Sequence, residues 1–594
     1  MNNPVRLNKP ISHPRLWLLA VVVGVIAGVG AVVFRGLIGL FHNSLFLGRL
    51  SFVYDANLHT PASPWGAAVI LVPVLGAAGV AYLVKNFAVE AKGHGVPEVM
   101  EAIHYQKGII RPLVAVIKSL ASALSIGSGG SVGREGPIVQ IGSAFGSTMG
   151  QVLHLPAWQR ITMIAAGAGG GIAATFNTPI GGVLFAAELL LHEVSVWTLV
   201  PVVISTATAT YIGRLLLGAN PSFVIPAFQT PYFHHTNPLV LLAYLGLGCM
   251  MGLVSTLFIR SVYAAEDFFE KRVPGNYYTR HLSGMLVVGV LIYLTRQCSG
   301  QYYIDGIGYS TVQDVLTGTL SSLYLLLALF ALKVVATSLT LGSGGSGGIF
   351  SPALFLGATF GGAYGILLDR LFPALPIDPP AFAVVGMAGV VGGATGAAIT
   401  AIVMIFEMTL DYNVILPMTV TVAISYGVRK FLCKDSIYSL KLTRRGHNMP
   451  EALQANFPMV RLARDIMEKG LRVVPASTRL DALSQVLSEP GQGEYLLVEN
   501  QGVVAGVIKH NSALQRLARN AAGVPILEVA NERFEVVTEN TALFDVVTKM
   551  HARKVALFLV TSRPAPVSVQ DVQGVLSKER IADVLTETIR LARE

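Results

Sequence analysis

Residues 127–150 read GSGGSVGREGPIVQIGSAFGSTMG, and residues 342–365 read GSGGSGGIFSPALFLGATFGGAYG. The two stretches align without a gap, 215 residues apart, and 11 of their 24 positions are identical. Lys118 and Lys333, each inside an apolar run, extend the match upstream at the same offset. The chain is therefore built from two copies of one plan.

The composition places this duplicated body in a lipid bilayer. Of 594 residues, 53% are hydrophobic and 13% charged; residues 434–594 hold 39 charged residues and the first 433 hold only 38. An apolar body therefore precedes a water-soluble tail. Several apolar stretches are too long or too rich in glycine for one straight helix, so we expect an α-helical polytopic membrane protein with more helices than stretches. The stretches lie near residues 16–41, 66–84, 161–191, 196–217, 239–259, 283–295, 322–341, 353–372, 381–408 and 414–432.

The charges outside the bilayer predict orientation and partners. Arg6, Lys9 and Arg15 precede the first apolar run, which has no short signal-like core, so we expect an uncleaved, cytoplasmic N-terminus. No dense run of Lys and Arg is interleaved with aromatic residues, which argues against nucleic acid as a partner. Short loops favour a bacterial inner membrane.

Each repeated loop has the features of a helix start. Pro137 and Pro352 suit the first turn of a helix, and the glycines before them let the backbone approach a small ion. The first N–H groups of a helix are unpaired and carry the positive end of its dipole. Two such ends aimed at one point would bind an anion and still release it quickly. Glycine stretches in membranes more often serve close packing, but duplication favours a binding site here.

Four short motifs resemble those of the CLC family of chloride channels and chloride/proton exchangers. In chain order they are GHGVPEVMEAI (93–103), GREGP (133–137), GGIFSP (347–352) and the tyrosine of IYSL (437–440). The resemblance implies a CLC-type inverted repeat of tilted and broken helices. It also implies a homodimer with one anion pathway per subunit, chloride as the transported ion, and no enzymatic activity.

The resemblance assigns roles to single residues. Glu135 looks like the family's gating glutamate, whose carboxylate competes with the permeating anion, and a salt bridge to Arg134 is its alternative role. Tyr438 corresponds to a hydroxyl donor at the central anion site, with an interfacial anchor as its alternative. No metal site and no catalytic residue is expected. The resemblance implies chloride binding by His94, Gly95, Arg134, Glu135, Gly136, Ile349, Phe350 and Tyr438.

Two departures from the family pattern concern selectivity and mechanism. Many members have Ser or Pro at the position of His94. Its imidazole either donates an N–H to chloride or turns away and leaves neighbouring backbone N–H groups to bind. Proton-coupled members typically carry an acid directly after the position of Glu188, as an internal proton relay, and this chain has Leu189.

An aliphatic side chain carries no proton, so Leu189 favours passive or weakly coupled conduction over obligate chloride/proton exchange. A water chain or another acid, such as Glu98, Glu101 or Glu188, would keep exchange open. Glu188 and Glu407, at equivalent places in the two copies, are expected to make structural hydrogen bonds. Lys118 and Lys333 are expected to satisfy buried backbone or carboxylate groups rather than to contact chloride.

The tail resembles the paired CBS modules that follow many CLC membrane domains, and its alternating strand-like and helical patterns independently predict α/β units. Ser577 fits a nucleotide-binding pattern, but Arg580 stands where the ribose-binding Asp would be, so adenine nucleotide binding and a structural dimerising role both stay open. The predicted domains are a transmembrane domain (1–440, with halves near 16–225 and 235–433), a linker (441–458) and two modules (459–521 and 522–594).

Two rival functions match the sequence less well. A magnesium channel needs carboxylates that converge in a pore, whereas this body offers glycine-rich helix starts. An intramembrane serine hydrolase would use Ser128 or Ser343 with His154 or His192, but the two repeated serines have no consistent histidine partner.

Overall fold

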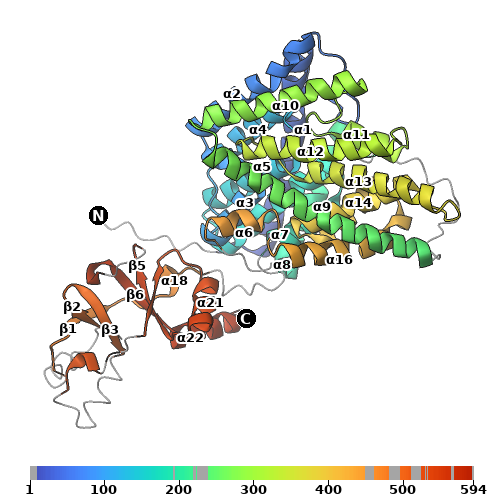
Figure 1. Cartoon of the computed structure of the whole chain (residues 1–594). Coiled ribbons are helices and arrows are strands. Elements are labelled where there is room, and N and C mark those ends of the chain that lie inside the picture. Colours follow the sequence, from blue (N-terminus) through green and yellow to red (C-terminus); the bar gives the residue numbers. More distant parts are fainter. Residues whose placement is uncertain are drawn as a thin grey trace. The chain divides into compact units, whose positions relative to one another are not determined.

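The computed structural model divides the chain into two compact units, Met1–Ala452 and Leu453–Glu594 (Figure 1). The first unit is helical, and the second combines strands with helices. Arg6, Lys9, His192 and residues 448–458 of the predicted linker lie outside the described residues. The structure describes residues 10–191, 194–218, 223, 238–447, 461–479, 495–509, 524–528, 530, 533–563 and 568–591.

In the described part of the membrane unit, two consecutive sets of eight α-helices follow one another in the same order. The first set is α1 (His13–Leu47), α2 (Val72–Asn86), α3 (Val96–Tyr105), α4 (Leu113–Gly127), α5 (Glu135–Val152), α6 (Ala157–Phe176), α7 (Pro179–Leu189) and α8 (Val196–Leu217). The second set is α9 (Pro238–Lys271), α10 (Tyr277–Ser299), α11 (Tyr309–Leu316), α12 (Leu323–Gly342), α13 (Phe350–Leu371), α14 (Pro379–Thr395), α15 (Ala398–Thr409) and α16 (Ile415–Leu432), and α17 (Ser439–Arg444) follows it.

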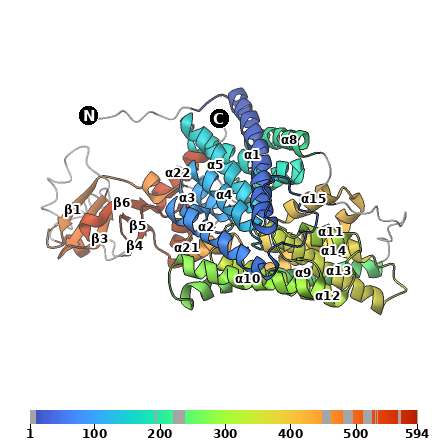
Figure 2. The same ribbon diagram turned by 90° about the horizontal axis from the view of Figure 1, so that it is seen from above.

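The packing within the two sets is also repeated. α5 packs on α6 as α13 packs on α14, and α1 packs on α8 as α9 packs on α16. Figure 2 shows α1 to α5 on one side of this unit and α9 to α14 on the other. The two copies meet where α7 contacts α15.

Close backbone contact explains part of the glycine content. A Cβ atom on Gly142 of α5 would lie 2.1 Å from the carbonyl oxygen of Gly167 on α6, and the reverse distance is also 2.1 Å. Gly357 and Gly386 form the corresponding contact between α13 and α14, at 2.4 Å in each direction. Small residues let membrane helices approach this closely.

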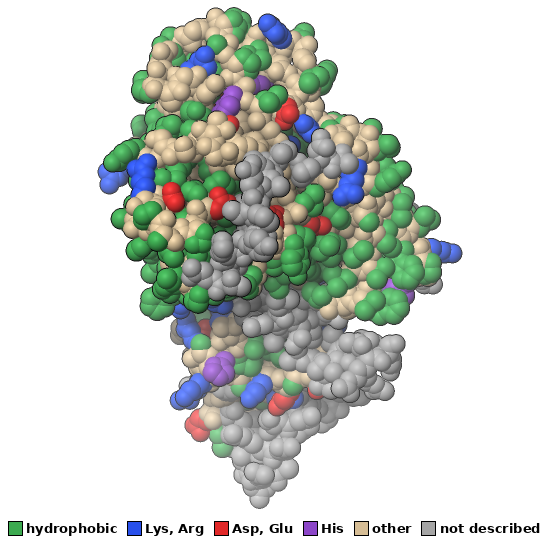
Figure 3. Space-filling model, turned by 90° about the vertical axis from the view of Figure 1, so that its right-hand side faces the viewer, with side chains coloured by type: hydrophobic (Ala, Val, Ile, Leu, Met, Phe, Trp, Pro, Cys, Tyr) green, Lys and Arg blue, Asp and Glu red, His purple; other side chains and the backbone are tan. Residues whose placement is uncertain are grey.

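The apolar surface and the helix lengths fit a bilayer. Large apolar side chains on the outside of the membrane unit, such as Leu18, Leu75 and Leu215, are exposed, and Figure 3 shows hydrophobic side chains spread over the face of the unit that it draws. Water-soluble surfaces rarely carry so much exposed apolar area. Among the described residues, eight spans are long and apolar enough to cross: His13–Leu47, Gly66–Asn86, Val196–Leu217, Pro238–Lys271, Tyr277–Ser299, Leu323–Gly342, Phe350–Leu371 and Tyr412–Leu432.

Two of the long apolar stretches contain a break, which confirms the expectation of more helices than stretches. Residues 161–191 divide into α6 and α7, because Asn177 adopts the left-handed conformation (φ 62°) and Pro179 begins the next helix. Residues 381–408 divide into α14 and α15 at Gly396 (φ 80°). The shorter helices α4, α7, α14 and α15 contain 11 to 17 residues.

The described residues of the second unit form two sheets of identical topology. In each sheet the first two strands are parallel and the third is antiparallel to the second. Tyr495 and Leu497 of one sheet are buried with Leu559 and Val575 of the other. The strands are β1 (Leu471–Pro475), β2 (Tyr495–Asn500), β3 (Val503–Lys509), β4 (Glu535–Thr538), β5 (Leu557–Thr561) and β6 (Val572–Ser577), and the helices include α18 (Ala463–Ile466), α21 (Leu543–Arg553) and α22 (Lys578–Leu591).

The segment that precedes each sheet in the chain forms hydrogen bonds with residues next to the other sheet. The Ala463 N–H donates to the Thr541 carbonyl at 2.8 Å, beside β4. The Ile526 N–H donates to the Thr478 carbonyl at 2.9 Å, after β1. The two α/β repeats are therefore interlocked along the chain, and a boundary near residue 521 does not separate their contacts.

Candidate anion pathway

The glycine loops that precede α3, α5 and α13 are joined by backbone hydrogen bonds. Gly133 and Gly348 exchange two N–H···O bonds, at 2.8 and 2.7 Å. The Gly93 N–H donates to the Gly345 carbonyl at 3.0 Å, and the Gly347 N–H donates to the Gly93 carbonyl at 3.2 Å. The two repeated loops therefore meet, as the duplication predicts, and three helices begin around one locus.

Only glycine fits at the closest approach of these loops. A Cβ atom on Gly136 would lie 2.0 Å from the carbonyl oxygen of His94. Gly95 has φ 89°, and a Cβ atom there would lie 2.7 Å from the carbonyl oxygen of Gly136. Gly95 and Gly136 therefore line the locus with backbone alone.

The Glu135 side chain is buried at this locus, with 2% of its surface exposed. Its Oε2 accepts the Ser351 backbone N–H at 3.3 Å, and its Oε1 accepts the Tyr309 hydroxyl at 2.9 Å and also the Ser351 hydroxyl. Ser351 lies in the first turn of α13. A carboxylate from one copy thus occupies the helix N-terminus of the other, a position that favours negative charge.

The predicted backbone donors lie beside this carboxylate. Ile349 and Phe350, at the start of α13, are buried. Within the described part of the chain their N–H groups have no hydrogen-bond acceptor, as is usual for the first residues of a helix. An anion at this end of α13 would meet both groups.

The Tyr438 side chain is buried inside the protein, with 2% of its surface exposed. Its neighbour Ile437 fixes the segment: the Ile437 N–H donates to the Ala394 carbonyl at 2.9 Å, and the Tyr263 hydroxyl donates to the Ile437 carbonyl at 2.6 Å. The alternative role of Tyr438 as an interfacial anchor does not fit this burial.

Arg134 lies against aromatic rings instead of pairing with Glu135. Its guanidinium carbon is 5.4 Å from the centre of the Tyr309 ring and 5.8 Å from that of Phe176, and Nη2 donates to the Thr175 carbonyl at 3.3 Å. No ion pair joins Arg134 to Glu135 in the described ranges, which excludes the salt-bridge role. The Arg134 Nε is buried and has no partner among those residues.

His94 keeps both of its predicted alternatives. The side chain is 4% exposed, and its ring centre lies 6.3 Å from that of Tyr263. Its Nδ1 is buried and makes no hydrogen bond with any described residue. The imidazole therefore has the capacity to bind an anion, while the His94 carbonyl contacts the start of α5.

Glu188 and Glu407 make reciprocal caps, which confirms the structural hydrogen bonds expected of them. The Glu188 carboxylate accepts the backbone N–H groups of Ile399 (3.2 Å) and Thr400 (2.9 Å), at the start of α15. The Glu407 carboxylate accepts the N–H of Gly181 (2.6 Å), at the start of α7. Leu189 is buried and ends α7. The acid next to Leu189 is thus already engaged by three donors, counting the Thr400 hydroxyl.

Lys118 and Lys333 bind backbone carbonyl groups in the loops before α3 and α11, respectively. Lys118 Nζ donates to the Gly93 carbonyl at 2.7 Å, and Lys333 Nζ donates to the Gly306 carbonyl at 3.1 Å. Each lysine makes a second bond to another carbonyl of the same loop. The expectation that they satisfy buried backbone is confirmed.

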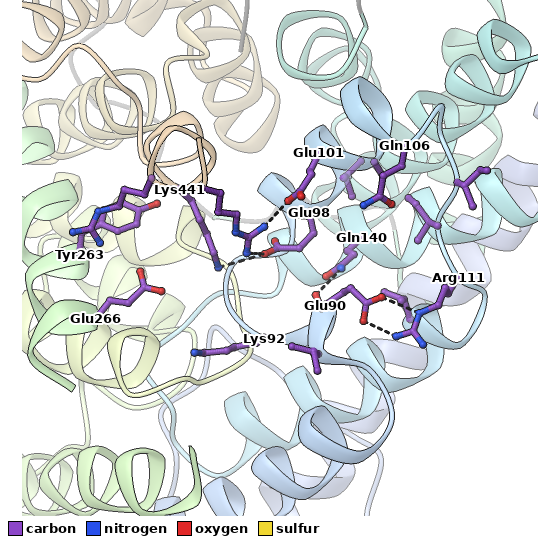
Figure 4. Close-up of a pocket in the computed structure, with 18 of the residues that line it drawn as sticks. Glu90, Lys92, Glu98, Glu101, Gln106, Arg111, Gln140, Tyr263, Glu266 and Lys441 are labelled. Atoms are coloured by element: carbon purple, nitrogen blue, oxygen red, sulfur yellow. Dashed lines mark hydrogen bonds and ion pairs between the residues drawn. The ribbon is translucent and has the colours of Figure 1, made fainter. Parts of the chain in front are cut away.

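One hollow reaches Arg134 and Tyr309, and a second lies along α3. The first, of about 520 Å³, is lined by Arg35, Asp55, Arg134, Arg214 and Tyr309 among others. The second, of about 670 Å³, is lined by charged residues of α3, α17 and their neighbours (Figure 4). There Lys441 lies 3.3 Å from Glu98, and Arg445 lies 2.5 Å from Glu101.

The residues of the hydrolase alternative are not arranged for catalysis. The Ser343 hydroxyl lies 2.9 Å from Nδ1 of His281, not of His154, and donates to the Thr340 carbonyl. The Ser128 hydroxyl donates to the Ser125 carbonyl. These serines end α4 and α12 and serve the helix ends.

Tyr309 and Ser351 are site residues that the sequence reasoning missed. A signal for Tyr309 was present: Gly306-Ile307-Gly308-Tyr309 repeats Gly93-His94-Gly95-Val96 at an offset of 213 residues. Ser351 aligns with Gly136 of the first copy, which has no side chain, so the repeat gave no signal for a hydroxyl at this position.

A duplicated helical membrane body whose helix N-termini meet around a buried carboxylate defines a polytopic anion transporter. The model of the voltage gated chloride channel family matches residues 75–430, and the chain belongs to this family. It is an integral multi-pass membrane protein that transports anions, chloride being the ion of the family, and it is not an enzyme.

The most informative relatives agree with this assignment. The chain is 34% identical over 388 residues to the H(+)/Cl(-) exchange transporter ClcA of Vibrio parahaemolyticus, covering 64% of this chain and 80% of that protein. It matches the structure of a slow cyanobacterial Cl-/H+ antiporter with a TM-score of 0.63 and 26% identity, over 73% of this chain and 99% of that one. A eukaryotic CLC transporter shares the fold over 96% of this chain and 98% of its own, with a TM-score of 0.60 and 22% identity.

Proposed function

We propose that the chain exchanges chloride for protons and that Glu135 both blocks the anion position and carries the proton. The observation behind this is the Glu135 carboxylate on the N-terminus of α13, held by Tyr309 and Ser351. When ionised, this carboxylate excludes an anion from the helix end. When it gains a proton, it loses its attraction to that end and yields to chloride.

Chloride would be bound mainly by partial charges. The N–H groups of Ile349 and Phe350, the Tyr438 hydroxyl and the backbone around Gly95 and Gly136 are the donors we assign. Arg134 and His94 add buried nitrogens without partners among the described residues. Weak, multiple donors allow an anion to enter and leave.

The relatives favour exchange over the passive conduction that Leu189 suggests. The Vibrio parahaemolyticus relative is named as an H(+)/Cl(-) exchange transporter and the cyanobacterial structure as a Cl-/H+ antiporter. Proton movement in this chain then cannot pass through Leu189, and Glu188 is committed to the start of α15. Glu98 and Glu101 of α3 line the charged hollow, together with Glu90, and are the acids we consider for this route.

Passive chloride conduction is the second candidate. It is favoured by the buried Leu189 at the relay position and by the three donors that saturate Glu188. Under this alternative, Glu135 would gate the pathway without coupling the proton to the anion.

Transport in liposomes distinguishes the two candidates. We expect a chloride gradient to drive protons against their own gradient, in the direction opposite to chloride. Glu135→Gln should abolish proton movement while chloride flux continues, and Glu579→Gln, in the exposed tail, should behave as wild type. Chloride flux with no proton movement in the wild type would establish the passive candidate; no chloride flux at any pH would overturn both.

We further propose a homodimer with one pathway per subunit in a bacterial inner membrane, with the N-terminus and a CBS-type tail in the cytoplasm. The two sheets of equal topology in the tail support the CBS-type part of this proposal. The Ser577 hydroxyl accepts the Arg580 N–H at 3.0 Å, as an N-cap of α22, which favours a structural role over ribose binding. Titration with ATP and AMP should give no heat of binding; saturable binding would contradict this.

A further inference from the structure

The helices α3 and α11 begin with the same backbone conformation but have different side chains at their first position. Each follows a glycine with positive φ, Gly95 at 89° and Gly308 at 82°. At the first helical position α3 has Val96, whereas α11 has Tyr309. The duplicated scaffold therefore presents a phenol to the anion pathway from the second copy.

Tyr309 is held rigidly. It is 1% exposed, and its ring lies between Phe223, at 5.0 Å between ring centres, and the Arg134 guanidinium, at 5.4 Å. Its hydroxyl contacts the Glu135 carboxylate at 2.9 Å and the Ser351 hydroxyl at 3.0 Å. Because Phe223 and Arg134 pack against the ring, we take the Glu135 carboxylate, which gains and loses the proton, as the member of this group that moves.

The three groups satisfy one another in two ways. While Glu135 is ionised, both hydroxyl protons point to its oxygens, and hydrogen bonds to a charged acceptor are the stronger kind. Once Glu135 carries a proton and leaves, the Ser351 hydroxyl can donate to the Tyr309 hydroxyl, 3.0 Å away. When the glutamate leaves, this bond leaves fewer buried hydroxyl groups without a partner than two isolated hydroxyls would have.

We propose that Tyr309 and Ser351 act as a hydroxyl clamp: two positioning residues that hold ionised Glu135 on α13, pair with each other when it leaves, and so set the pH at which the pathway opens. The inference rests on the proposed role of Glu135 as gate. It adds to that role the groups that determine when the gate releases.

Other charged or titratable groups also act on this region. None of them is altered when a single hydroxyl is removed from the clamp, so a shift in the pH profile of such a variant reports the clamp itself. From the neighbouring elements these groups are Arg35 and Tyr54 beside Arg134, His94 before α3, Lys118 on α4, Arg134 before α5, Lys333 on α12 beside Gly308, and Tyr438 before α17.

The test measures chloride flux into liposomes as a function of pH. Tyr309→Phe and Ser351→Ala each remove one donor from ionised Glu135, so protonation becomes easier and opening occurs at higher pH. We expect the half-maximal pH to rise by about one unit for each variant, a tenfold change in proton concentration. Tyr364→Phe is the matched control, because it removes a hydroxyl bond of α13 to the Ala243 carbonyl and touches no part of the clamp.

Two further variants separate the possible failures. Ser351→Thr keeps a hydroxyl and should keep the wild-type half-maximal pH, whereas a shift equal to that of Ser351→Ala would mean that side-chain size matters and not the donor. In a Glu135→Ala background, Tyr309→Phe should change nothing.

Each outcome has one meaning. If Glu135→Ala retains the wild-type pH profile, the gate itself is wrong, and the clamp falls with it. If Glu135→Ala flattens the profile but Tyr309→Phe leaves the half-maximal pH unchanged, only the clamp is overturned. A rise with Tyr309→Phe that persists without Glu135 would show that the phenol acts on another group.

Discussion

The loops before α3 and α11 share a backbone and differ in chemistry. Both have a glycine of positive φ and both are held by a buried lysine, Lys118 or Lys333. The first loop places His94, with an unpartnered Nδ1 among the described residues, beside the start of α5. The second places Tyr309 on Glu135. Duplication supplies the scaffold, and the positions at which the copies diverge supply the anion chemistry.

The same contrast holds between α5 and α13. Glu135 aligns with Phe350, and Gly136 aligns with Ser351. The first copy supplies the carboxylate of Glu135 and the space at Gly136. The second copy supplies the backbone N–H of Phe350 and the hydroxyl of Ser351 as donors. Exchanging residues between the copies therefore tests whether the division of roles is real.

The largest effect is expected when Gly136 is given the residue of its counterpart. In Gly136→Ser the new Cβ would lie 2.0 Å from the His94 carbonyl oxygen, so the loops before α3 and α5 must separate. We expect complete loss of chloride flux and, by overpacking, a loss of stability of about 1–3 kcal/mol. Flux assays and thermal unfolding in detergent measure both. Normal flux would show that the loops are not in close contact during transport.

Removing either lysine tests whether the two loops are equally supported. Lys118→Met and Lys333→Met each leave two buried carbonyl groups without their donor, at about 1–3 kcal/mol per group. We expect similar losses of thermal stability. Their transport effects should differ, with Lys118→Met weakening chloride binding and Lys333→Met shifting the pH profile through Tyr309. Identical transport defects would contradict the division of roles.

The reciprocal caps offer a matched pair with a smaller effect. Glu188→Gln and Glu407→Gln each weaken a carboxylate interaction with a helix start, and we expect each to cost about 0.5–2 kcal/mol. Proton movement per chloride should stay unchanged in both variants. A selective loss of coupling in Glu188→Gln would reveal Glu188 as a proton relay.

The smallest effect is expected at His94. If its unpartnered imidazole nitrogen faces the anion, His94→Ser should change the flux of bromide relative to chloride by a few-fold, about 1 kcal/mol or less. Competition between the two halides in the liposome assay measures this ratio. An unchanged ratio would assign anion binding there to backbone N–H groups alone.

The duplication predicted much of this structure from sequence. It predicted the meeting of the two glycine loops and the structural roles of Glu188 and Lys118, because repeated glycine and proline positions fix the backbone. The helical membrane body was predicted by the apolar composition and the long apolar stretches. The repeated Gly-x-Gly pattern pointed to the position of Tyr309, but the bonds of Tyr309 and Ser351 to Glu135 could not be found in this way. Their bonds to Glu135 join residues 174 and 216 positions apart. Such contacts depend on where the two copies differ, and a repeat pattern reports only where they agree.

The transport mode was also beyond pattern alone. Leu189 removes one known route for a proton but does not show whether another exists. In the tail, alternating patterns predicted α/β units, yet not that the segments around Ala463 and Ile526 contact each other's sheets. Strand patterns specify which face of a strand is buried, but not which sheet covers it.

The mutual capping of α7 by Glu407 and of α15 by Glu188 is an isologous contact folded into one polypeptide. An ancestral chain that carried a single copy could have made the same reciprocal capping contact with a second molecule of itself. Fusion of the two genes would then have freed each half to mutate separately, so that one has an acid at the start of α5 and the other a phenol at the start of α11.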